Sequence, residues 1–469
     1  MIELTAAEVA EATGGTPAGV DPGATVSGPV VVDSRRVEPG ALFVALPGEH
    51  VDGHDFAAGA VAQGASLVLA ARPLDGVPCV VVADVQVALG ELARVVLERL
   101  RARSEVRVVA VTGSMGKTTT KDLLGGLLAP EVDADAIVVP TGSFNNEIGL
   151  PLTVLRATDR TRLMVLEMGA DRPGNIADLT RLAPPDVGVV LAVGTAHVGV
   201  FGDVETIART KGEMVEGVRD GGTVVLNADD SRVAAMAARA AEETQVVTFG
   251  TISAAQVRAR DVVVDGGRAR FTLFVGEESA PVALRLVGAH HVTNALAAAT
   301  VAVRLGLPVD AVAERLSAAT PASPHRMAVT ERPDGVTVVD DSYNANPDSM
   351  RAALRTLAVM AGRTRRSVAV LGEMRELGEG ARTEHDAIGR LAVRLNVKRL
   401  VVVGEGAYHI HEGAQQEGSW GEESVFVPDL ATAREVLAAE LTGGDVVLVK
   451  ASNGSGLWRL ADELVEAAG

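Results

Sequence analysis

The apolar positions of the chain form short runs separated by turns, and their pattern changes twice along its length. Residues 28–56 contain the runs VVVDSR and LFVAL, which alternate with polar positions and are broken by Pro-Gly turns. This pattern predicts short alternating strands, followed by a short helix and the strands ASLVLAA and CVVVA. Residues 87–103 have apolar positions at helical spacing and basic residues at their end, which predicts a connecting helix.

From about residue 105, expected strands and helices alternate. The strands are VRVVAVTG, AIVVP, RLMVLEMG, DVGVVLAVG and GTVVLNAD. This rhythm is typical of a mostly parallel sheet covered by helices. Residues 246–287 differ, because apolar and polar positions alternate between Gly and Asp turns, which predicts antiparallel strands. The next segment, HHVTNALAAATVAVRLG, predicts a helix that stops at a glycine.

A third unit begins near the Pro-rich residues 319–327. Its expected strands are VTVVDD, SVAVLGE, RLVVVGE, SVFVP and DVVLVKAS, and the final helix is GLWRLADELVEAA. This pattern predicts a second doubly wound sheet. We therefore expect an α/β protein of three domains: a small mixed α/β N-terminal domain (1–103), a central parallel-sheet domain (104–320) and a Rossmann-like, doubly wound C-terminal domain (321–469). A length of 469 residues fits this division, because one core rarely serves so long a chain.

Composition narrows the possible partners and location. Apolar residues make up 47% of the chain and aromatic residues 3%, which is typical of a soluble α/β protein and not of a disordered chain. The net charge of −18 disfavours nucleic acid and anionic lipid as partners. A single cysteine, Cys79, allows no internal disulfide and fits a cytoplasmic location. The start of the chain lacks the pattern of a secretory signal, and no stretch predicts a membrane span.

The segment VRVVAVTGSMGKTTTKDLL, residues 106–124, carries the clearest chemical signal. A Gly-rich loop between a strand and a helix points backbone N–H groups at a polyphosphate. Lys117 can reach the β- and γ-phosphates, and the Thr118 hydroxyl can bind Mg²⁺. A turn without function is the alternative, but the strand and helix on either side favour a P-loop ATPase domain. The expected nucleotide contacts are Gly113, Ser114, Met115, Gly116, Lys117, Thr118 and Thr119.

Two further polar residues follow strands of this expected sheet. Glu167 ends RLMVLEMG, and His197 follows the next strand in LAVGTAHVG. Carboxyl ends of parallel strands meet at one edge, where the sites of such sheets gather, and Mg²⁺ prefers oxygen ligands. The residues alone leave open whether these two are metal ligands or an ordinary strand-end acid and loop histidine. Lys211, in ETIARTKGEMVEGV, by itself resembles an exposed helix lysine.

Together these segments resemble the Mur ligase family. TGSMGKT, LEMG, GTAHVG and ARTKGEM occur in the order typical of that family, and GAHHVTNALAA, PHRM, DDSYNANP and VKAS agree with it. The resemblance covers essentially the whole chain. FNNEIGLPLTVL, DDSYNANPDSM and LGEMRELG are similar to the branch that joins D-alanyl-D-alanine to UDP-N-acetylmuramoyl-tripeptide, whereas the N-terminal DSR discriminates less.

The resemblance implies a mechanism. ATP would phosphorylate the terminal carboxylate of the tripeptide, and the dipeptide amine would then displace phosphate from the acyl phosphate. Two Mg²⁺ ions and Lys117 would offset the repulsion between carboxylate and γ-phosphate. Thr118 and Glu167 would bind the first ion, while His197 and a Lys211 carrying a CO₂-derived carbamate would serve the second. The resemblance thus makes Lys117, Glu167, His197 and Lys211 the expected catalytic residues.

The resemblance also implies further contacts to ATP. His290 and Asn294, in GAHHVTNALAA, match the adenine-contacting segment, although Asn294 could instead cap a helix. Arg326 would reach the γ-phosphate from the third domain, or alternatively form an inter-domain salt bridge. Asp341 would bind the ribose, or form a turn. Closure of the second and third domains over ATP is expected to assemble these groups.

Six residues match contacts to the other substrates. They are Ser34 and Arg35 for the UDP-sugar, Asn145 and Asn146 for its peptide, and Asn344 and Asn346 for the dipeptide. An arginine suits a pyrophosphate, but all six also suit ordinary turns. Lys450, in VKAS, would lie near the dipeptide or the phosphates, or be a plain strand-end lysine.

Three other functions compete with this one. A sister ligase would add a single diamino acid and is expected to lack DDSYNANP and LGEMRELG, and a folate glutamate ligase would not need the N-terminal unit. A non-catalytic P-loop nucleotide switch belongs to another class, and it would hydrolyse ATP slowly whatever peptide is present. A ligase releases phosphate only with both substrates, and we expect it to act as a monomer.

Overall fold

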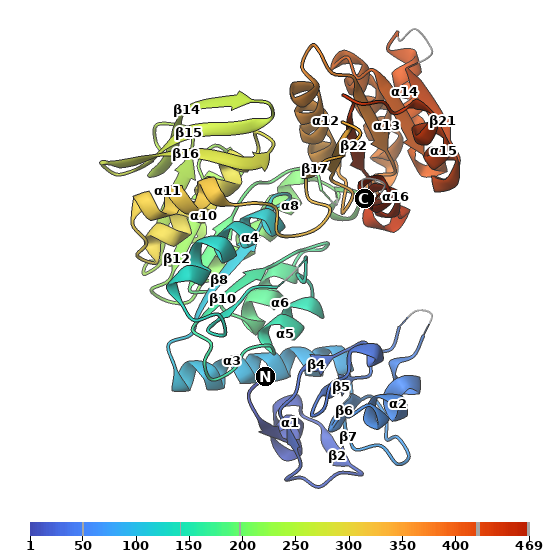
Figure 1. Ribbon diagram of the computed structural model, residues 1–469. Helices are drawn as coiled ribbons and strands as arrows, with labels where there is room; N and C mark the ends of the chain where they lie inside the picture. Colours follow the sequence, from blue (N-terminus) through green and yellow to red (C-terminus); the bar gives the residue numbers. More distant parts are fainter. Residues whose placement is uncertain (49–50, 141, 197, 419–422, 467–469) are drawn as a thin grey trace.

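The computed structural model describes residues 1–48, 51–140, 142–196, 198–418 and 423–466. Figure 1 shows an N-terminal domain at one end, a central domain and a C-terminal domain that lies beside the upper part of the central one. Each contains its own sheet. The expected α/β class with three domains is confirmed, while the boundaries at 103/104 and 320/321 stay a prediction.

The sheet of the N-terminal domain is mainly parallel. Its strand order is β2 (Thr16–Ala18), β7 (Cys79–Val81), β6 (Leu67–Ala70), β5 (Leu42–Val44) and β4 (Val30–Val31), with only the β2–β7 pair antiparallel. The expected in–out alternation is wrong for β5, which is buried at every position. Leu42 and Val44 pack into one hydrophobic cluster and Phe43 into another, because both faces of this sheet are covered.

Short elements and one long helix complete this domain. They are the pair β1 (Leu4–Thr5) and β3 (Thr25–Val26), α1 (Ala6–Thr13), α2 (Ala57–Ala62) and the predicted connecting helix α3 (Val85–Arg103). Asp84 caps α3 by accepting a hydrogen bond from the Val87 N–H, and Ser104 ends it. The buried side chains of α3 pack against the central domain as well as its own, so α3 joins the two.

The central sheet runs in the order β16, β15, β14, β13, β12, β11, β8, β10, β9. Its parallel strands are β8 (Arg107–Thr112), β9 (Ile137–Val138), β10 (Leu163–Glu167), β11 (Val187–Val190), β12 (Thr223–Asn227) and β13 (Gln245–Gly250). β14 (Val257–Asp265), β15 (Arg268–Val275) and β16 (Glu278–Val287) pair antiparallel with one another as predicted, whereas β14 joins β13 in parallel. The antiparallel prediction is wrong for β13, because the crossover through α9 (Ser231–Ala235) returns the chain parallel to β12.

Helices cover both faces of the central sheet (Figure 1). The carboxyl edge of this sheet faces the C-terminal domain. The helices are α4 (Lys117–Leu128), α5 (Gly149–Val154), α6 (Asn175–Leu182), α7 (Val198–Phe201), α8 (Val204–Glu216), α10 (His291–Arg304) and α11 (Val309–Ala318). Along β8, Val109 and Val111 pack into one core, and Val108 and Ala110 into the opposite one. The strand is therefore buried on both faces, and only its end opens to ligands.

The C-terminal sheet has the order β17 (Ala328–Glu331), β18 (Thr337–Asp340), β22 (Val446–Lys450), β19 (Ser367–Leu371), β20 (Arg399–Val403), β21 (Ser424–Val427), parallel except at β17. Its helices are α12 (Pro347–Ala361), α13 (Ala381–Arg394), α14 (Tyr408–Gln416), α15 (Leu430–Glu440) and α16 (Trp458–Glu466). The predicted doubly wound sheet is confirmed. Over the part of the chain that is described, no helix is long and apolar enough to cross a bilayer.

Candidate active site

A cavity of about 480 Å³ lies where the central and C-terminal domains meet. This volume lies within the range of cofactor and substrate pockets, about 300–1,000 Å³. Most of the predicted site residues line it: Gly113, Ser114, Met115, Gly116, Lys117, Thr118, Thr119, Asn145, Asn146, Glu167, Lys211, His290, Asn294, Arg326, Asp341, Asn344 and Asn346. The central and C-terminal units therefore both contribute residues to one cavity, as the resemblance implies.

The phosphate loop leaves the buried strand β8 and opens α4, as predicted. Gly113 and Gly116 have φ angles of 150° and 82°, which residues with a side chain rarely adopt. A Cβ atom at Gly116 would lie 2.3 Å from the Asn294 side-chain oxygen, so only glycine lets α10 approach the loop here. The first turn of α4 lines the cavity, and its N-cap Gly116 supplies no side-chain capping bond. Because the first N–H groups of a helix have no partner within the helix, this end suits a phosphate.

A buried carboxylate lies directly beside this loop. Glu167 ends β10 with 1% of its surface exposed, and its Oε2 accepts a 2.9 Å hydrogen bond from the Thr118 hydroxyl. Asn145 donates to Glu167 Oε1 at 2.7 Å, and the Ser143 hydroxyl lies 2.8 Å from that of Thr118. The Thr118 hydroxyl thus contacts oxygens of both Ser143 and Glu167, and oxygen is the donor type that Mg²⁺ prefers. Asn145 faces this acid, a neighbour that the sequence did not predict.

Two lysines point into the same buried region. Lys117 Nζ donates to the Gly113 carbonyl at 2.8 Å, and burial lowers its pKa against the opposing effect of Glu167. Lys211, on α8, is only 3% exposed, so the alternative of an exposed helix lysine is wrong. Burial, and to a smaller extent the charge of Lys117, lowers the pKa of Lys211 to about 7. His197, predicted to act beside Lys211, lies outside the described residues.

Two histidines and an asparagine form the start of α10. His290 is the N-cap residue and makes no side-chain capping bond, so the capping alternative for Asn294 is wrong. The Asn294 side-chain nitrogen lies 3.2 Å from His291 Nδ1, and the His290 and His291 rings are 4.1 Å apart. Burial lowers the pKa of both histidines, which favours neutral rings. His291, for which no role was predicted, lines the cavity too.

Arg326 reaches the phosphate loop from the segment that links the two domains. Its Nη2 donates to the Thr118 hydroxyl at 3.1 Å and to the Ser143 hydroxyl at 2.9 Å. Its guanidinium lies over the Tyr343 ring, 3.9 Å from the ring centre. Since Arg326 forms no ion pair within the described ranges, the salt-bridge alternative is not supported. Ser143 and Tyr343 were not predicted, although Ser143 directly precedes FNNEIGLPLTVL and Tyr343 lies in DDSYNANPDSM.

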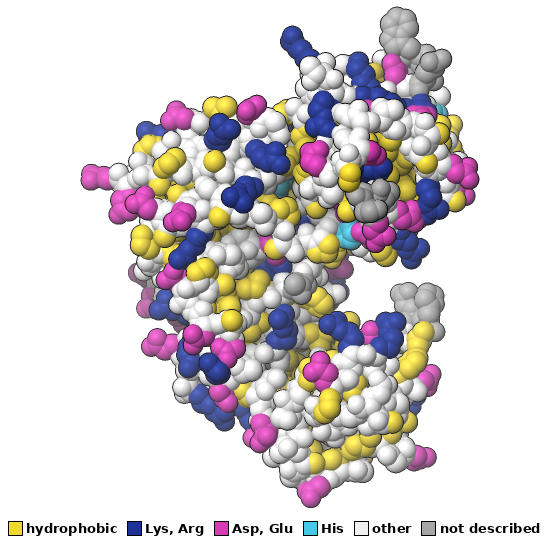
Figure 2. Space-filling view, viewed as in Figure 1, with side chains coloured by type: hydrophobic (Ala, Val, Ile, Leu, Met, Phe, Trp, Pro, Cys, Tyr) yellow, Lys and Arg dark blue, Asp and Glu magenta, His cyan; other side chains and the backbone are white. Residues whose placement is uncertain are grey.

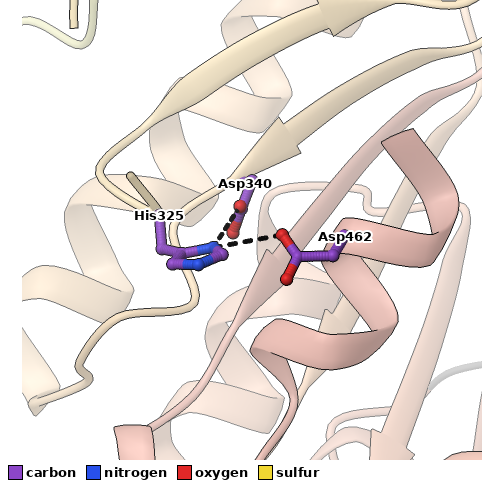
Figure 3. Close-up of side chains that lie close together, drawn as sticks. All are labelled: His325, Asp340 and Asp462. Atoms are coloured by element: carbon purple, nitrogen blue, oxygen red, sulfur yellow. Dashed lines mark hydrogen bonds and ion pairs between the residues drawn. The ribbon is translucent and has the colours of Figure 1, made fainter. Parts of the chain in front are cut away.

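The backbone around Arg326 is held by its neighbours. His325 and Met327 both have positive φ angles, 58° and 52°, so Arg326 lies between two left-handed residues. Figure 3 shows the His325 ring pointing at Asp340, with Nδ1 2.7 Å from Oδ2, and 3.9 Å from an oxygen of Asp462. The sequence did not predict this group. The Ser342 N–H and hydroxyl both donate to the other oxygen of Asp340. These contacts hold the segment around Arg326 that links the central and C-terminal domains.

The loop after β18 is anchored by a buried ion pair. Lys450 Nζ lies 2.5 Å from Asp341 Oδ2 and donates to the Asn344 carbonyl at 2.8 Å. Asp341 Oδ1 accepts from the Met327 N–H at 3.2 Å. Asn346 caps α12 in a reciprocal pair with Ser349. Lys450 therefore holds the loop that presents Asn344 and Asn346 to the cavity.

The predicted UDP-sugar contacts do not line this cavity. Ser34 and Arg35 lie in a short 3₁₀ turn capped by Asp33. Arg35 donates two side-chain hydrogen bonds to Asp33, at 2.9 and 2.8 Å, and these lower the pKa of Asp33 to about 2. Asn146 accepts from the Gly149 N–H at 2.9 Å at the start of α5. For Ser34, Arg35 and Asn146 the structure shows local contacts, and their substrate roles stay predictions.

A P-loop domain and a doubly wound domain that share one cavity, joined to a smaller N-terminal domain, define a three-domain nucleotide-binding enzyme. Family models agree over three segments: "Mur ligase family, catalytic domain" at 29–102, "Mur ligase middle domain" at 111–302 and "Mur ligase, glutamate ligase domain" at 325–453. With the relatives described next, these matches show that the chain belongs to the Mur ligase family.

Curated relatives match over nearly the whole chain. The UDP-N-acetylmuramoyl-tripeptide–D-alanyl-D-alanine ligase of Mycobacterium tuberculosis (strain ATCC 25618 / H37Rv) is 51% identical, covering 99% of this chain and 98% of the relative. That of Escherichia coli (strain K12) is 34% identical, covering 99% of each. MurF from Acinetobacter baumannii superposes with a TM-score of 0.86 at 30% identity, covering 99% of each chain. MurF ligase from Thermotoga maritima in complex with ADP gives 0.79 at 31% identity, covering 94% and 98%.

Proposed function

We propose that this chain is an ATP-dependent ligase that joins D-alanyl-D-alanine to UDP-N-acetylmuramoyl-tripeptide. The observation that carries the proposal is the convergence of Thr118, Glu167 and Arg326 from two domains on one cavity. The names of relatives up to 51% identical over nearly the whole chain support the substrates. The motifs DDSYNANPDSM and LGEMRELG support the same branch of the family.

The reaction has two balanced steps. A tripeptide carboxylate oxygen attacks the γ-phosphorus of ATP, so an O–P bond forms, the bond to the bridging oxygen breaks, and ADP leaves. The dipeptide amine then attacks the acyl carbon, a C–N bond forms, phosphate departs with the C–O electrons, and the amine loses a proton. Phosphorylation is needed because a carboxylate is a poor electrophile. Lys117 and Arg326 bring positive charge to the transferring group.

The residues present fit the two Mg²⁺ ions that the family implies. Thr118 and Glu167 supply oxygen donors in contact with each other, and they would hold an ion that neutralises phosphate charge. His197 and Lys211 would serve the second ion. A protonated Lys211 would repel a cation, but with a pKa of about 7 its amine is partly uncharged at neutral pH. That form can bond to CO₂ and lose a proton, which gives an oxygen ligand.

The remaining predicted contacts complete the proposal. His290, Asn294 and Asp341 lie around the cavity where adenosine would bind. Figure 2 shows a hollow between the N- and C-terminal domains with basic side chains along its N-terminal side, where residues 1–103 contain arginines and no lysine. A basic rim suits the UDP-sugar, which Ser34 and Arg35 would contact. The single cysteine, Cys79, fits a reducing compartment, and we propose that the reaction takes place in the cytoplasm. We also propose that the chain acts as a monomer.

A substrate matrix tests this function. UDP-linked dipeptide and tripeptide precursors are each combined with single amino acids or D-Ala-D-Ala, and phosphate release is measured with ATP and Mg²⁺. The proposal expects rapid release only with the tripeptide and D-Ala-D-Ala together. Release with the dipeptide precursor and a diamino acid would establish the sister ligase. Slow release that no peptide changes would establish the nucleotide switch.

A further inference from the structure

A loop of the central domain is held from both sides. This loop, residues 192–196, follows β11 and lies beside the phosphate loop. On the central-domain side, the Gly194 N–H donates to the Ser114 hydroxyl at 2.9 Å, and the Ser114 N–H donates to the Ala192 carbonyl at 2.9 Å. The Val193 N–H donates to Asp230 at 2.8 Å. Two hydrogen bonds therefore join this loop directly to Ser114 of the phosphate loop, so a displacement of one loop is expected to displace the other.

On the other side the loop is bound by the C-terminal domain. Asp348 Oδ2 accepts two hydrogen bonds from Thr195, one from its N–H at 2.8 Å and one from its hydroxyl at 2.9 Å. Asp348 lies in the first turn of α12, two positions after the cap residue Asn346. A negative charge is favourable at that end of a helix. Two N–H or O–H donors to one carboxylate oxygen make a directional contact between the domains.

Asp348 is itself fixed in position. Its Oδ1 lies 3.2 Å from an Arg351 nitrogen, and Arg351 also pairs with Glu384 of α13 at 2.6 Å. A Cβ atom at Gly194 would lie 2.6 Å from Asp348 Oδ2, with every other atom at 3.5 Å or beyond. A methyl group at Gly194 would thus displace one group only, the Asp348 carboxylate. Glycine at this position lets the two domains meet.

We propose that Asp348 is a positioning residue that couples docking of the C-terminal domain to the shape of the phosphate loop. Through Thr195 and Gly194 it orders the loop that holds Ser114. The helix that carries Asp348 also presents Asn346 to the cavity, so the coupling links the proposed dipeptide side to the phosphates. The role in catalysis rests on the proposed ligase function, whereas the contact itself does not.

Kinetics of single and double variants test the coupling. Asp348→Ala removes the acceptor and Gly194→Ala pushes it away, so each is expected to lower kcat about 10- to 100-fold with little change in the KM for ATP. Because both open the same contact, the double variant is expected to lose no more than the worse single one. Asp348→Asn keeps an acceptor oxygen and should retain most activity. Asp386→Ala, which breaks an ion pair with Arg390 on α13, is the matched control.

Provided that the wild-type chain ligates its substrates, either of two kinetic outcomes would overturn the inference. One is a kcat for Asp348→Ala within twofold of wild type. The other is a double variant whose losses multiply. A wild-type chain that ligates nothing would instead refute the proposed function.

Hydrogen exchange measured residue by residue then tests the contact without ligation, in the full chain with a non-hydrolysable ATP analogue. Asp348→Ala should speed exchange of the Thr195 amide at least about tenfold and leave Val193, bound to Asp230, unchanged. Equal exchange at Thr195 in both proteins would overturn it.

Discussion

The buried amine of Lys211 predicts that CO₂ activates the chain in a pH-dependent way. A lysine with its ordinary pKa of 10.5 is uncharged in roughly 0.03% of molecules at pH 7, whereas a pKa of about 7 leaves roughly half uncharged. The uncharged fraction of Lys211 is thus larger by a factor on the order of 1,000. Because burial and Lys117 both disfavour the ammonium, the initial rate of carbamate formation at a fixed concentration of dissolved CO₂ should rise with the uncharged fraction of Lys211, from roughly 10% to 90% of its limit between pH 6 and pH 8.

The assay starts from enzyme stripped of CO₂ and adds ¹³C-bicarbonate at pH 6, 7 and 8. With dissolved ¹³CO₂ held at the same concentration at each pH, we expect a ¹³C carbamate signal whose initial rate of appearance follows the uncharged fraction of Lys211, and a ligation rate that rises with that signal. Lys211→Arg is the control, since its guanidinium forms no carbamate and keeps a positive charge. Lys211→Ala should lose activity, and high concentrations of a short carboxylic acid should restore part of it.

Three results would refute this reasoning about Lys211. The first is full activity after CO₂ removal at every pH. The second is a carbamate signal that persists in Lys211→Arg, and the third is near-normal activity of Lys211→Ala without added acid.

Three further predictions follow from single side chains. Arg326→Ala should lower kcat about 1,000-fold in an ADP-release assay, because it removes charge from the transferring phosphate, and a loss under tenfold would contradict that role. Lys121 is buried and its ammonium lies 2.6 Å from the Asp122 carboxylate. Lys121→Met should lower the free energy of unfolding by about 3 kcal/mol, because it leaves that carboxylate without its partner, and an unchanged Tm would contradict a stabilising role for this ion pair. Asn346→Ala should cost about 1 kcal/mol through loss of the α12 cap, and Asn346→Asp should restore stability but raise the KM for the dipeptide. If Asn346→Asp has a normal KM for the dipeptide, Asn346 acts only as the cap of α12 and does not contact the dipeptide.

The parts of the site that lie in one sequence segment could be predicted. The strand, loop and helix around Gly113–Thr119 are local, so pattern and turn chemistry were sufficient, and the same holds for Glu167 at the end of β10. β13 was misassigned, because alternation along one strand does not reveal the direction of its neighbour. Burial on both faces of β5 also depends on the helices that pack over it.

Contacts between distant segments could not be predicted from the sequence. Asp348 and Thr195 are 153 positions apart, and nothing in either segment indicates the other. Burial of Lys211 depends on how α8 packs, which helical spacing alone leaves open. The His325 group draws on β18 and α16, and only the folded linker brings them together (Figure 3).

The central claim is that the tripeptide carboxylate takes the γ-phosphate of ATP before the amide bond forms. The most direct measurement uses UDP-N-acetylmuramoyl-tripeptide with ¹⁸O in both oxygens of its terminal carboxylate, and mass spectrometry of the phosphate released during ligation. Transfer through an acyl phosphate leaves one ¹⁸O atom in each released phosphate and one in the carbonyl of the new amide. Ligation that yields phosphate free of ¹⁸O would contradict it.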